Sequence, residues 1–219
     1  MLEWMILGGS MMWFLLACSL AGLAVVLDRF WAFWRYSRVD NRALRANVFK
    51  LLRQEKVVEA ANLCASTGGP VAAVMLVGLQ TYHRHQGTAS RSESITAVMK
   101  EAMQDYSAAA ISSVEKRLVV MSLVANAAPL FGMCGTVTGM ITAFAAMSKA
   151  KGMDAGLVAG GISEALITTA AGLLIALFVV FPYWYFVGKS EQVTLEIDES
   201  IGQLIDFVAI ELENKERAS

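Results

Sequence analysis

Charge is absent from three long stretches of this sequence. Residues 4–27 and 118–148 contain no Asp, Glu, Lys or Arg, and residues 155–188 contain a single one, Glu164. Each stretch exceeds the roughly 20 apolar residues that cross about 30 Å of hydrocarbon. With 56% hydrophobic residues, the chain also carries more apolar surface than a soluble core of its length would hide. We therefore expect an all-α membrane protein with three transmembrane helices.

Cysteine and histidine are scarce, and their positions exclude two kinds of site. The three cysteines, Cys18, Cys64 and Cys134, form neither a disulfide framework nor a metal-binding spacing. The two histidines, His83 and His85, stand two positions apart and so lie on different faces of a helix. We expect no metal site and no cofactor. The formal net charge of −1 gives no electrostatic reason to expect a nucleic-acid partner.

Basic residues are nearly absent before the first uncharged stretch and frequent after it. Five arginines fall between residues 29 and 45, and Lys116 and Arg117 precede the second stretch. The positive-inside rule therefore places residues 28–117 and the C-terminus in the cytoplasm and the N-terminus outside, on the periplasmic side of an inner membrane. The first stretch lacks a basic leader and a cleavage site, so it is expected to remain as a span. The predicted segments are the periplasmic N-terminus with the first span (1–27), a cytoplasmic helical domain (28–117), the second span (118–148), a periplasmic loop (149–156), the third span (157–188) and a cytoplasmic C-terminal helix (189–219).

Apolar residues recur at near-helical spacing across the segments assigned to the cytoplasm. Residues 40–65 are predicted to form one helix, which ends in a turn at 66–69. The apolar segment 70–82 is too short to span and predicts a helix with Pro70 in its first turn. Nothing between residues 90 and 124 breaks a helix, so the second span is expected to continue a cytoplasmic helix without interruption. The third span is expected to continue in the same way through residues 191–216.

Glu164 is the one residue of Asp, Glu, Lys or Arg within the three stretches that predict the spans. An acidic side chain at mid-membrane costs on the order of 3 kcal/mol, so its presence indicates a function. Desolvation favours the neutral form of a carboxyl group, which allows such a group to take a proton from one side and release it to the other. The alternative is a carboxyl group that snorkels to the membrane surface.

Hydroxyl groups and small residues recur along the second and third spans. Thr136, Thr138, Thr168 and Thr169 could extend a polar path beside Glu164, although a threonine in a helix commonly bonds a carbonyl of its own preceding turn. Small residues recur at helical spacing on the second and third spans, which predicts close helix packing. The predicted packing positions are Pro129, Gly132, Gly135, Gly139, Gly161 and Gly172.

Two segments combine all of these features. Residues 128–140 read APLFGMCGTVTGM, and residues 161–173 read GISEALITTAAGL. Together with the order of the spans, they resemble the paired signature of the ExbB/TolQ/MotA proton-channel family. The resemblance covers nearly the whole chain. It implies that Glu164, Thr136 and Thr169 are the polar positions of a proton channel.

The resemblance also implies partners. Members of this family form a homopentamer around the single-span helices of a dimeric ExbD- or TolR-like subunit, which brings a membrane aspartate and lets the proton motive force drive motion. MotA-type subunits have four spans and a longer chain, which argues against that branch. An ExbB-like role that energises TonB-dependent outer-membrane transport is favoured over a TolQ-like role, which would involve a TolA-like protein. Membrane lipid is the remaining expected partner.

Two other kinds of function are weighed against the channel. A non-conducting membrane scaffold that assembles an envelope complex would also need three spans and close helix packing. An intramembrane enzyme is disfavoured, because the predicted spans contain no paired aspartate and no Ser–His pair, and the chain contains no HExxH motif. We therefore expect a protein that is not an enzyme.

Overall fold

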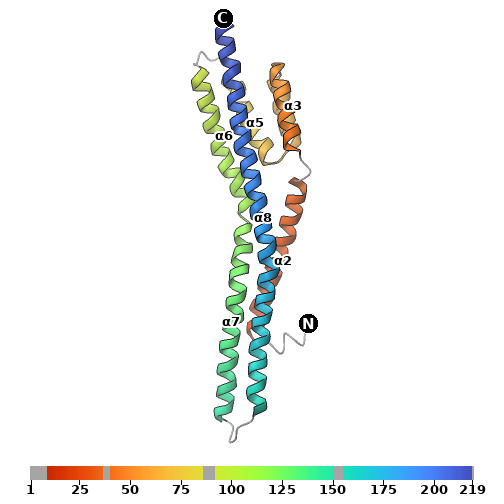
Figure 1. Ribbon diagram of the computed structural model, residues 1–219, viewed down its shortest axis with the longest axis vertical. Coiled ribbons are helices and arrows are strands. Elements are labelled where there is room, and N and C mark those ends of the chain that lie inside the picture. The colour runs from red at the N-terminus through yellow and green to blue at the C-terminus, as the bar shows by residue number, and fades with distance from the viewer. Residues whose placement is uncertain (1–8, 37–39, 86–91, 150–154, 219) are drawn as a thin grey trace. The chain divides into compact units, whose positions relative to one another are not determined.

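All regular structure in the described part of the chain is helical. The computed structural model describes residues 9–36, 40–85, 92–149 and 155–218. Three helical stretches there are long and apolar enough to cross a membrane, namely Met11–Trp34, Ile95–Ser148 and Val158–Asn214. The predicted all-α class and the three spans are confirmed. The helices are α2 (Met11–Tyr36), α3 (Asn41–Arg53), α4 (Val57–Thr67), α5 (Pro70–His85), α6 (Ser92–Glu115), α7 (Leu118–Lys149) and α8 (Ala155–Ala218) (Figure 1).

The chain divides into two compact units. The span unit comprises residues 1–31 and 117–186, and the helical-domain unit comprises residues 32–116 and 187–219. Helices α2 and α8 contribute residues to both units. Helix α8 does so as a single element of 64 residues, which runs from cyan to dark blue in Figure 1. The prediction that the third span continues as a long helix is therefore confirmed.

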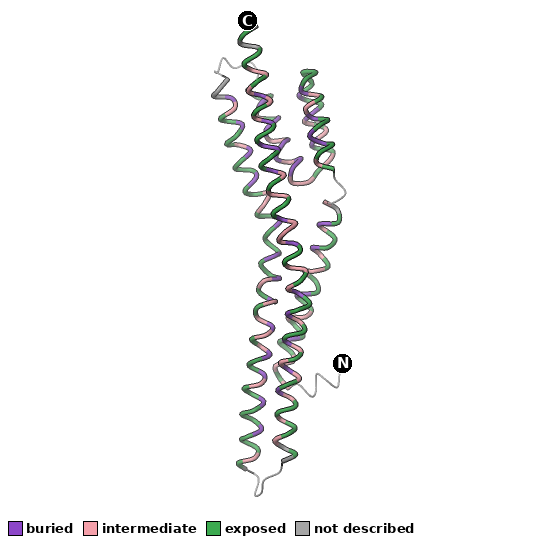
Figure 2. The backbone as a smooth tube through the Cα atoms, in the orientation of Figure 1, coloured by how far each residue is buried: buried purple, intermediate pink, exposed green. Residues whose placement is uncertain are grey.

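Helix α2 packs against both other helices of the span unit. Leu15, which is 1% exposed, forms a buried cluster with Ala128 and Ala176, and the ring of Phe14 stacks on that of Phe131 with centroids 5.6 Å apart. Exposed residues (green) recur between the buried ones (purple) along these helices in Figure 2. Apolar residues exposed in this way suit a surface that faces lipid or another membrane helix.

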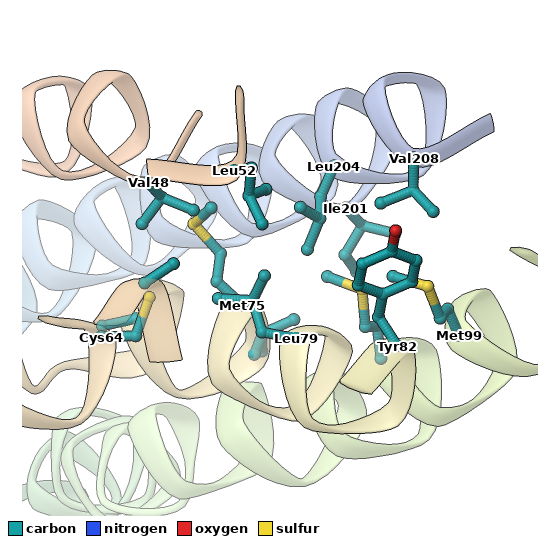
Figure 3. Close-up of a cluster of buried hydrophobic side chains, with 14 of the residues drawn as sticks. Val48, Leu52, Cys64, Met75, Leu79, Tyr82, Met99, Ile201, Leu204 and Val208 are labelled. Atoms are coloured by element: carbon teal, nitrogen blue, oxygen red, sulfur yellow. The ribbon is translucent and has the colours of Figure 1, made fainter. Parts of the chain in front are cut away.

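The helical-domain unit has a core of its own. Buried side chains from α3, α4, α5, α6 and α8 meet there, and Figure 3 shows Met75 and Leu79 of α5 close to Leu204 of α8. Gly78 lets α5 approach its neighbours, because a Cβ atom at that position would lie 2.5 Å from the sulfur of Met103. Burial of these aliphatic and thioether groups is the main source of stability for the unit, at about 25 cal/mol per Å² removed from water.

Polar groups fix α3 to α8 beside this core. The buried guanidinium group of Arg45 donates to Oε2 of Glu199 at 2.9 Å and to the hydroxyl of Ser200 at 3.2 Å. The side-chain amide of Asn41 donates to Oε2 of Glu196 at 2.5 Å. A buried guanidinium group needs such acceptors, because an unpaired buried charge is strongly destabilising.

The single helix predicted over residues 40–65 is wrong. The structure has two helices there, α3 and α4, separated by residues 54–56. Glu55 adopts a left-handed φ of 58°, and the amides of Gln54 and Glu55 donate to carbonyls of the last turn of α3. Both Leu52 and Val57 reach the core across this break. Apolar spacing at helical period persists through the turn, which explains why the pattern alone predicts one helix.

The uninterrupted helix predicted before the second span is also wrong in one place. Residues 116 and 117 form a turn that separates α6 from α7. The amide of Lys116 still donates to the carbonyl of Ser112 at 2.9 Å, while the guanidinium group of Arg117 pairs with the carboxylate of Asp28. The break therefore falls at Arg117, whose partner Asp28 lies on another helix. Helix propensity depends on local sequence and does not encode such a contact.

The thiol of Cys64 is expected to be almost inert in the folded protein. Cys64 is 1% exposed, and burial raises the pKa of its thiol to about 11. Since the thiolate is the reactive form, we expect maleimide labelling at neutral pH to be at least roughly 100-fold slower than for an ordinary surface cysteine. The control is Val58→Cys in a Cys64→Ala background, because Val58 lies on the same helix and is 55% exposed. Equal labelling rates would contradict the buried position of Cys64.

Candidate functional site

Helices α7 and α8 approach each other through the predicted small residues. A Cβ atom at Gly172 would lie 2.6 Å from the carbonyl oxygen of Ala128, and one at Gly132 would lie 3.1 Å from the Cα of Thr169. A Cβ atom at Gly139 would lie 3.3 Å from the carbonyl oxygen of Gly161. Neighbours this close are backbone atoms, which cannot move aside. Gly132, Gly139, Gly161 and Gly172 thus lie in one contact between α7 and α8, as does Gly135, whose added Cβ would overlap the side chain of Thr168.

Pro129 lies inside α7 next to this contact. It is partly buried, and the residue before it, Ala128, is fully buried with its carbonyl oxygen beside Gly172. A proline has no N–H to donate to the preceding turn, and neighbouring helices commonly compensate for this in membranes. Pro129 therefore borders the predicted packing face.

The threonine hydroxyls bond in two different ways. Thr136 donates to the carbonyl of Met133 at 2.7 Å and Thr168 donates to the carbonyl of Glu164 at 2.9 Å, each within its own helix. Thr138 likewise donates to Cys134 and Gly135. Thr169 instead crosses to α7 and donates to the carbonyl of Gly132 at 2.9 Å. The hydroxyl of Thr169 therefore joins α8 to α7.

Glu164 is partly buried on α8, and its carboxyl group has no hydrogen-bond or ion-pair partner among the described residues. Five positions separate it from Thr169, which at about 3.6 residues per turn places the two side chains about 140° apart around α8. Its carboxyl oxygen Oε1 lies against Gly9, at the start of α2. The structure thus brings Thr169 and the small residues together in the α7–α8 contact and directs Glu164 towards α2.

A second polar cluster lies within the span unit at the other end of the uncharged stretch of α2. Asp28 receives hydrogen bonds from Arg29, at 3.1 Å from Nη2, and from Arg117. Arg29 is 7% exposed. In the sequence, these arginines indicate only the orientation of the spans, and their pairing with Asp28 is not evident. The sequence feature that could have indicated this pairing is Asp28 followed by Arg29, directly after the uncharged residues 4–27.

The chain belongs to the MotA/TolQ/ExbB proton channel family. The model of that family matches residues 67–199, which include α5, α6, α7 and the part of α8 that carries Glu164. The resemblance inferred from residues 128–140 and 161–173 is therefore confirmed. Membership makes the chain a multi-pass membrane protein of the proton-channel, stator-like type.

Curated relatives carry both of the expected names. The chain is 45% identical over 73 residues to the Tol-Pal system protein TolQ of Haemophilus influenzae, a match that covers 33% of this chain and 32% of that protein. It is 28% identical to the putative biopolymer transport protein ExbB-like 1 of Synechocystis, over 92% of this chain and 76% of that protein. It is 24% identical to the biopolymer transport protein ExbB of Pseudomonas putida, over 90% of this chain and 62% of that protein.

Metal-binding geometry is not found in the part of the chain that the structure describes. No group of three or more His, Cys, Asp or Glu side chains lies close enough together there to hold a metal ion. The chemistry that the described site offers is one carboxyl group, several hydroxyl groups and backbone carbonyls. Such groups can exchange protons and hydrogen bonds.

Proposed function

We propose that this chain is the channel-forming subunit of a proton-driven motor in the bacterial inner membrane, with its N-terminus in the periplasm and its C-terminus in the cytoplasm. The observation that carries the proposal is Glu164, the only Asp, Glu, Lys or Arg in residues 155–188, which lies in the segment matched by the proton-channel family model. A protein that only anchors a complex would gain nothing from this costly residue. We infer that the chain is not an enzyme.

Proton transfer would proceed by protonation and deprotonation of the Glu164 carboxyl group. The neutral acid is the form that moves readily through an apolar environment, and the carboxylate is the form that accepts the next proton. Each charge that crosses gains about 2.3 kcal/mol per 100 mV of membrane potential. Thr136, Thr168 and Thr169 are the hydroxyl groups proposed to support the path. They bridge only part of about 30 Å of hydrocarbon.

A partner is therefore part of the proposal. We propose a homopentamer of this chain around a single-span ExbD- or TolR-like subunit whose membrane aspartate completes the path. An ExbB-like role, which energises TonB-dependent outer-membrane transport, is favoured. The ExbB-like proteins of Synechocystis and Pseudomonas putida align with 92% and 90% of this chain, whereas the TolQ of Haemophilus influenzae aligns with 33%. A TolQ-like role with a TolA-like protein is the second candidate, supported by 45% identity over that shorter segment.

The proposal is tested by proton flux into vesicles. Vesicles containing this chain alone are expected to hold an imposed pH gradient, because one carboxyl group and a few hydroxyl groups do not span the membrane. Vesicles containing the chain together with its single-span partner are expected to dissipate the gradient. The measurement is the fluorescence of an entrapped pH-sensitive dye after a potassium diffusion potential is applied.

Two results would count against this scheme. Rapid, Glu164-dependent dissipation by the chain alone would make it a self-sufficient channel. No flux in the presence of the partner, with a complex of correct stoichiometry in the vesicles, would favour the non-conducting scaffold. The matched control is the partner alone at the same protein-to-lipid ratio.

A further inference from the structure

We propose that Gly9 is a positioning residue, which holds the carboxyl group of Glu164 at the N-terminal end of α2. An ideal Cβ atom built at Gly9 would overlap Oε1 of Glu164 and lie 3.2 Å from the carboxyl carbon. The carboxyl group therefore lies directly against the backbone of Gly9, in the space that the side chain of any other residue would fill. The inference rests on the proposed function of Glu164 in proton transfer.

The backbone conformation of Gly9 also requires a glycine at this position. Its φ is 65°, in the left-handed region that glycine adopts readily and that other residues rarely adopt. Its carbonyl accepts a hydrogen bond from the amide of Met12 at 3.2 Å, which opens the first turn of α2. Gly9 thus links the start of α2 to the position of the Glu164 side chain.

The start of a helix is an electrostatically favourable place for a carboxylate. The first-turn N–H groups of a helix have no acceptors within the helix and carry partial positive charge, so a carboxylate beside them is favoured. No other charged side chain competes in the described parts of the spans, since residues 11–27 and 118–148 are uncharged and Glu164 is the only charge in residues 155–188. Helix α2 would then be part of the proton site, in addition to being a membrane anchor.

The first test is the reaction of Glu164 with a hydrophobic carbodiimide, which modifies protonated carboxyl groups. In Gly9→Ala the new methyl group would overlap Oε1 of Glu164, so the carboxyl group must move away from the start of α2 and becomes more accessible to the reagent. Without its contact with the helix terminus, Glu164 is expected to be modified about two- to fivefold faster at a fixed pH than in the unchanged protein. The measurement is mass spectrometry of the peptide that contains Glu164 in the full-length protein.

Two control variants separate positioning from general disturbance. Gly160→Ala adds a methyl group one turn before Glu164 in open space. Gly68→Ala adds one at a similar positive φ of 70°, far from Glu164 in sequence and with nothing within 4 Å. Both are expected to label like the unchanged protein. A Gly9→Ala protein that folds and labels at an unaltered rate would overturn the proposal.

The second test removes the carboxyl group that a side chain at residue 9 would overlap. In a background without the native cysteines, the pair Gly9→Cys and Glu164→Cys is expected to form a disulfide with a mild oxidant. The control pair is Gly9→Cys and Leu166→Cys with Glu164→Ala, which removes the same overlap. It is expected not to form a disulfide, because Leu166 is 63% exposed and lies about 200° around α8 from Glu164. Equal crosslinking of the two pairs, or crosslinking of neither, would overturn the proposal.

These tests separate failure of the inference from failure of the proposed function. Labelling and crosslinking report where the carboxyl group lies and require no proton flux. Undiminished flux through Glu164→Gln, together with selective crosslinking of the Gly9 and Glu164 pair, would remove the proton role and leave the contact in place. Loss of flux in Glu164→Gln, together with unaltered labelling in Gly9→Ala, would remove the positioning role alone.

Discussion

Glu164→Gln is expected to assemble with the partner and to lower proton flux by at least about 100-fold, the scale of a lost acid–base group. The substitution nearly preserves the shape of the side chain but removes the ability to bind and release a proton. A neutral amide is also less costly in a membrane than a carboxylate, so the variant should fold at least as well. The measurement is flux into vesicles that contain both subunits, with the amount of assembled complex determined in the same preparation.

Ser163→Ala is the matched control for this variant. Ser163 precedes Glu164 on α8 and is exposed, so the substitution changes a polar residue at the same depth without touching the carboxyl group. It is expected to conduct like the unchanged protein. If Glu164→Gln also retained full flux, the carboxyl group would not carry the proton and the scaffold function would gain support.

The spans and their extension were predictable because they depend on local composition. An uncharged stretch in lipid must form a helix to satisfy its own backbone, which leaves little choice of structure for residues 118–148. The length of α8 was predictable for the same kind of reason, since an apolar stripe continues beyond Gly188 with no proline in residues 191–216. Pro70 at the start of α5 follows from its fixed φ.

The breaks in the other helices were not predictable from periodicity. The turn at residues 54–56 requires Glu55 in a left-handed conformation, and the turn at residues 116–117 accompanies the pairing of Arg117 with Asp28. Both depend on tertiary contacts that offset local preference for a helix. The hydrophobic pattern is compatible with either outcome, because core-facing residues stand on both sides of each turn.

The candidate site was predictable in its residues and only partly in its geometry. The small residues of α7 and α8 do lie in one contact, and Thr169 bridges the helices through the carbonyl of Gly132. The direction of Glu164 could not be inferred, because nothing in the sequence relates residue 9 to residue 164. A contact between residues so far apart in sequence is set by how three helices pack, which a hydrophobic pattern does not specify. The role of these residues in proton transfer remains a prediction.

Gly172→Leu is expected to disrupt the packing of α7 on α8. A Cβ atom at this position would meet the carbonyl oxygen of Ala128 at 2.6 Å and the Cα of Gly132 at 3.1 Å, so a leucine side chain has no space without separation of the helices. Overpacking of this kind costs about 3 kcal/mol or more. For a chain of this length the melting temperature would fall by roughly 6–12 °C. The measurement is thermal unfolding in detergent, followed by tryptophan fluorescence.

Gly160→Leu supplies the comparison that makes the result specific. Gly160 lies on the same helix in open space, with nothing within 4 Å of an added Cβ atom. The two variants add the same apolar side chain to α8, so a difference between their melting temperatures reports the α7–α8 contact and not the hydrophobicity of the helix. In lipid or detergent, an apolar side chain gains little free energy by moving from its apolar surroundings into a contact with another helix. The fit between side chains therefore decides which helices associate. Equal stability of the two variants would mean that Gly172 does not lie in a tight helix contact, and the close approach of α7 and α8 beside Thr169 would have to be abandoned.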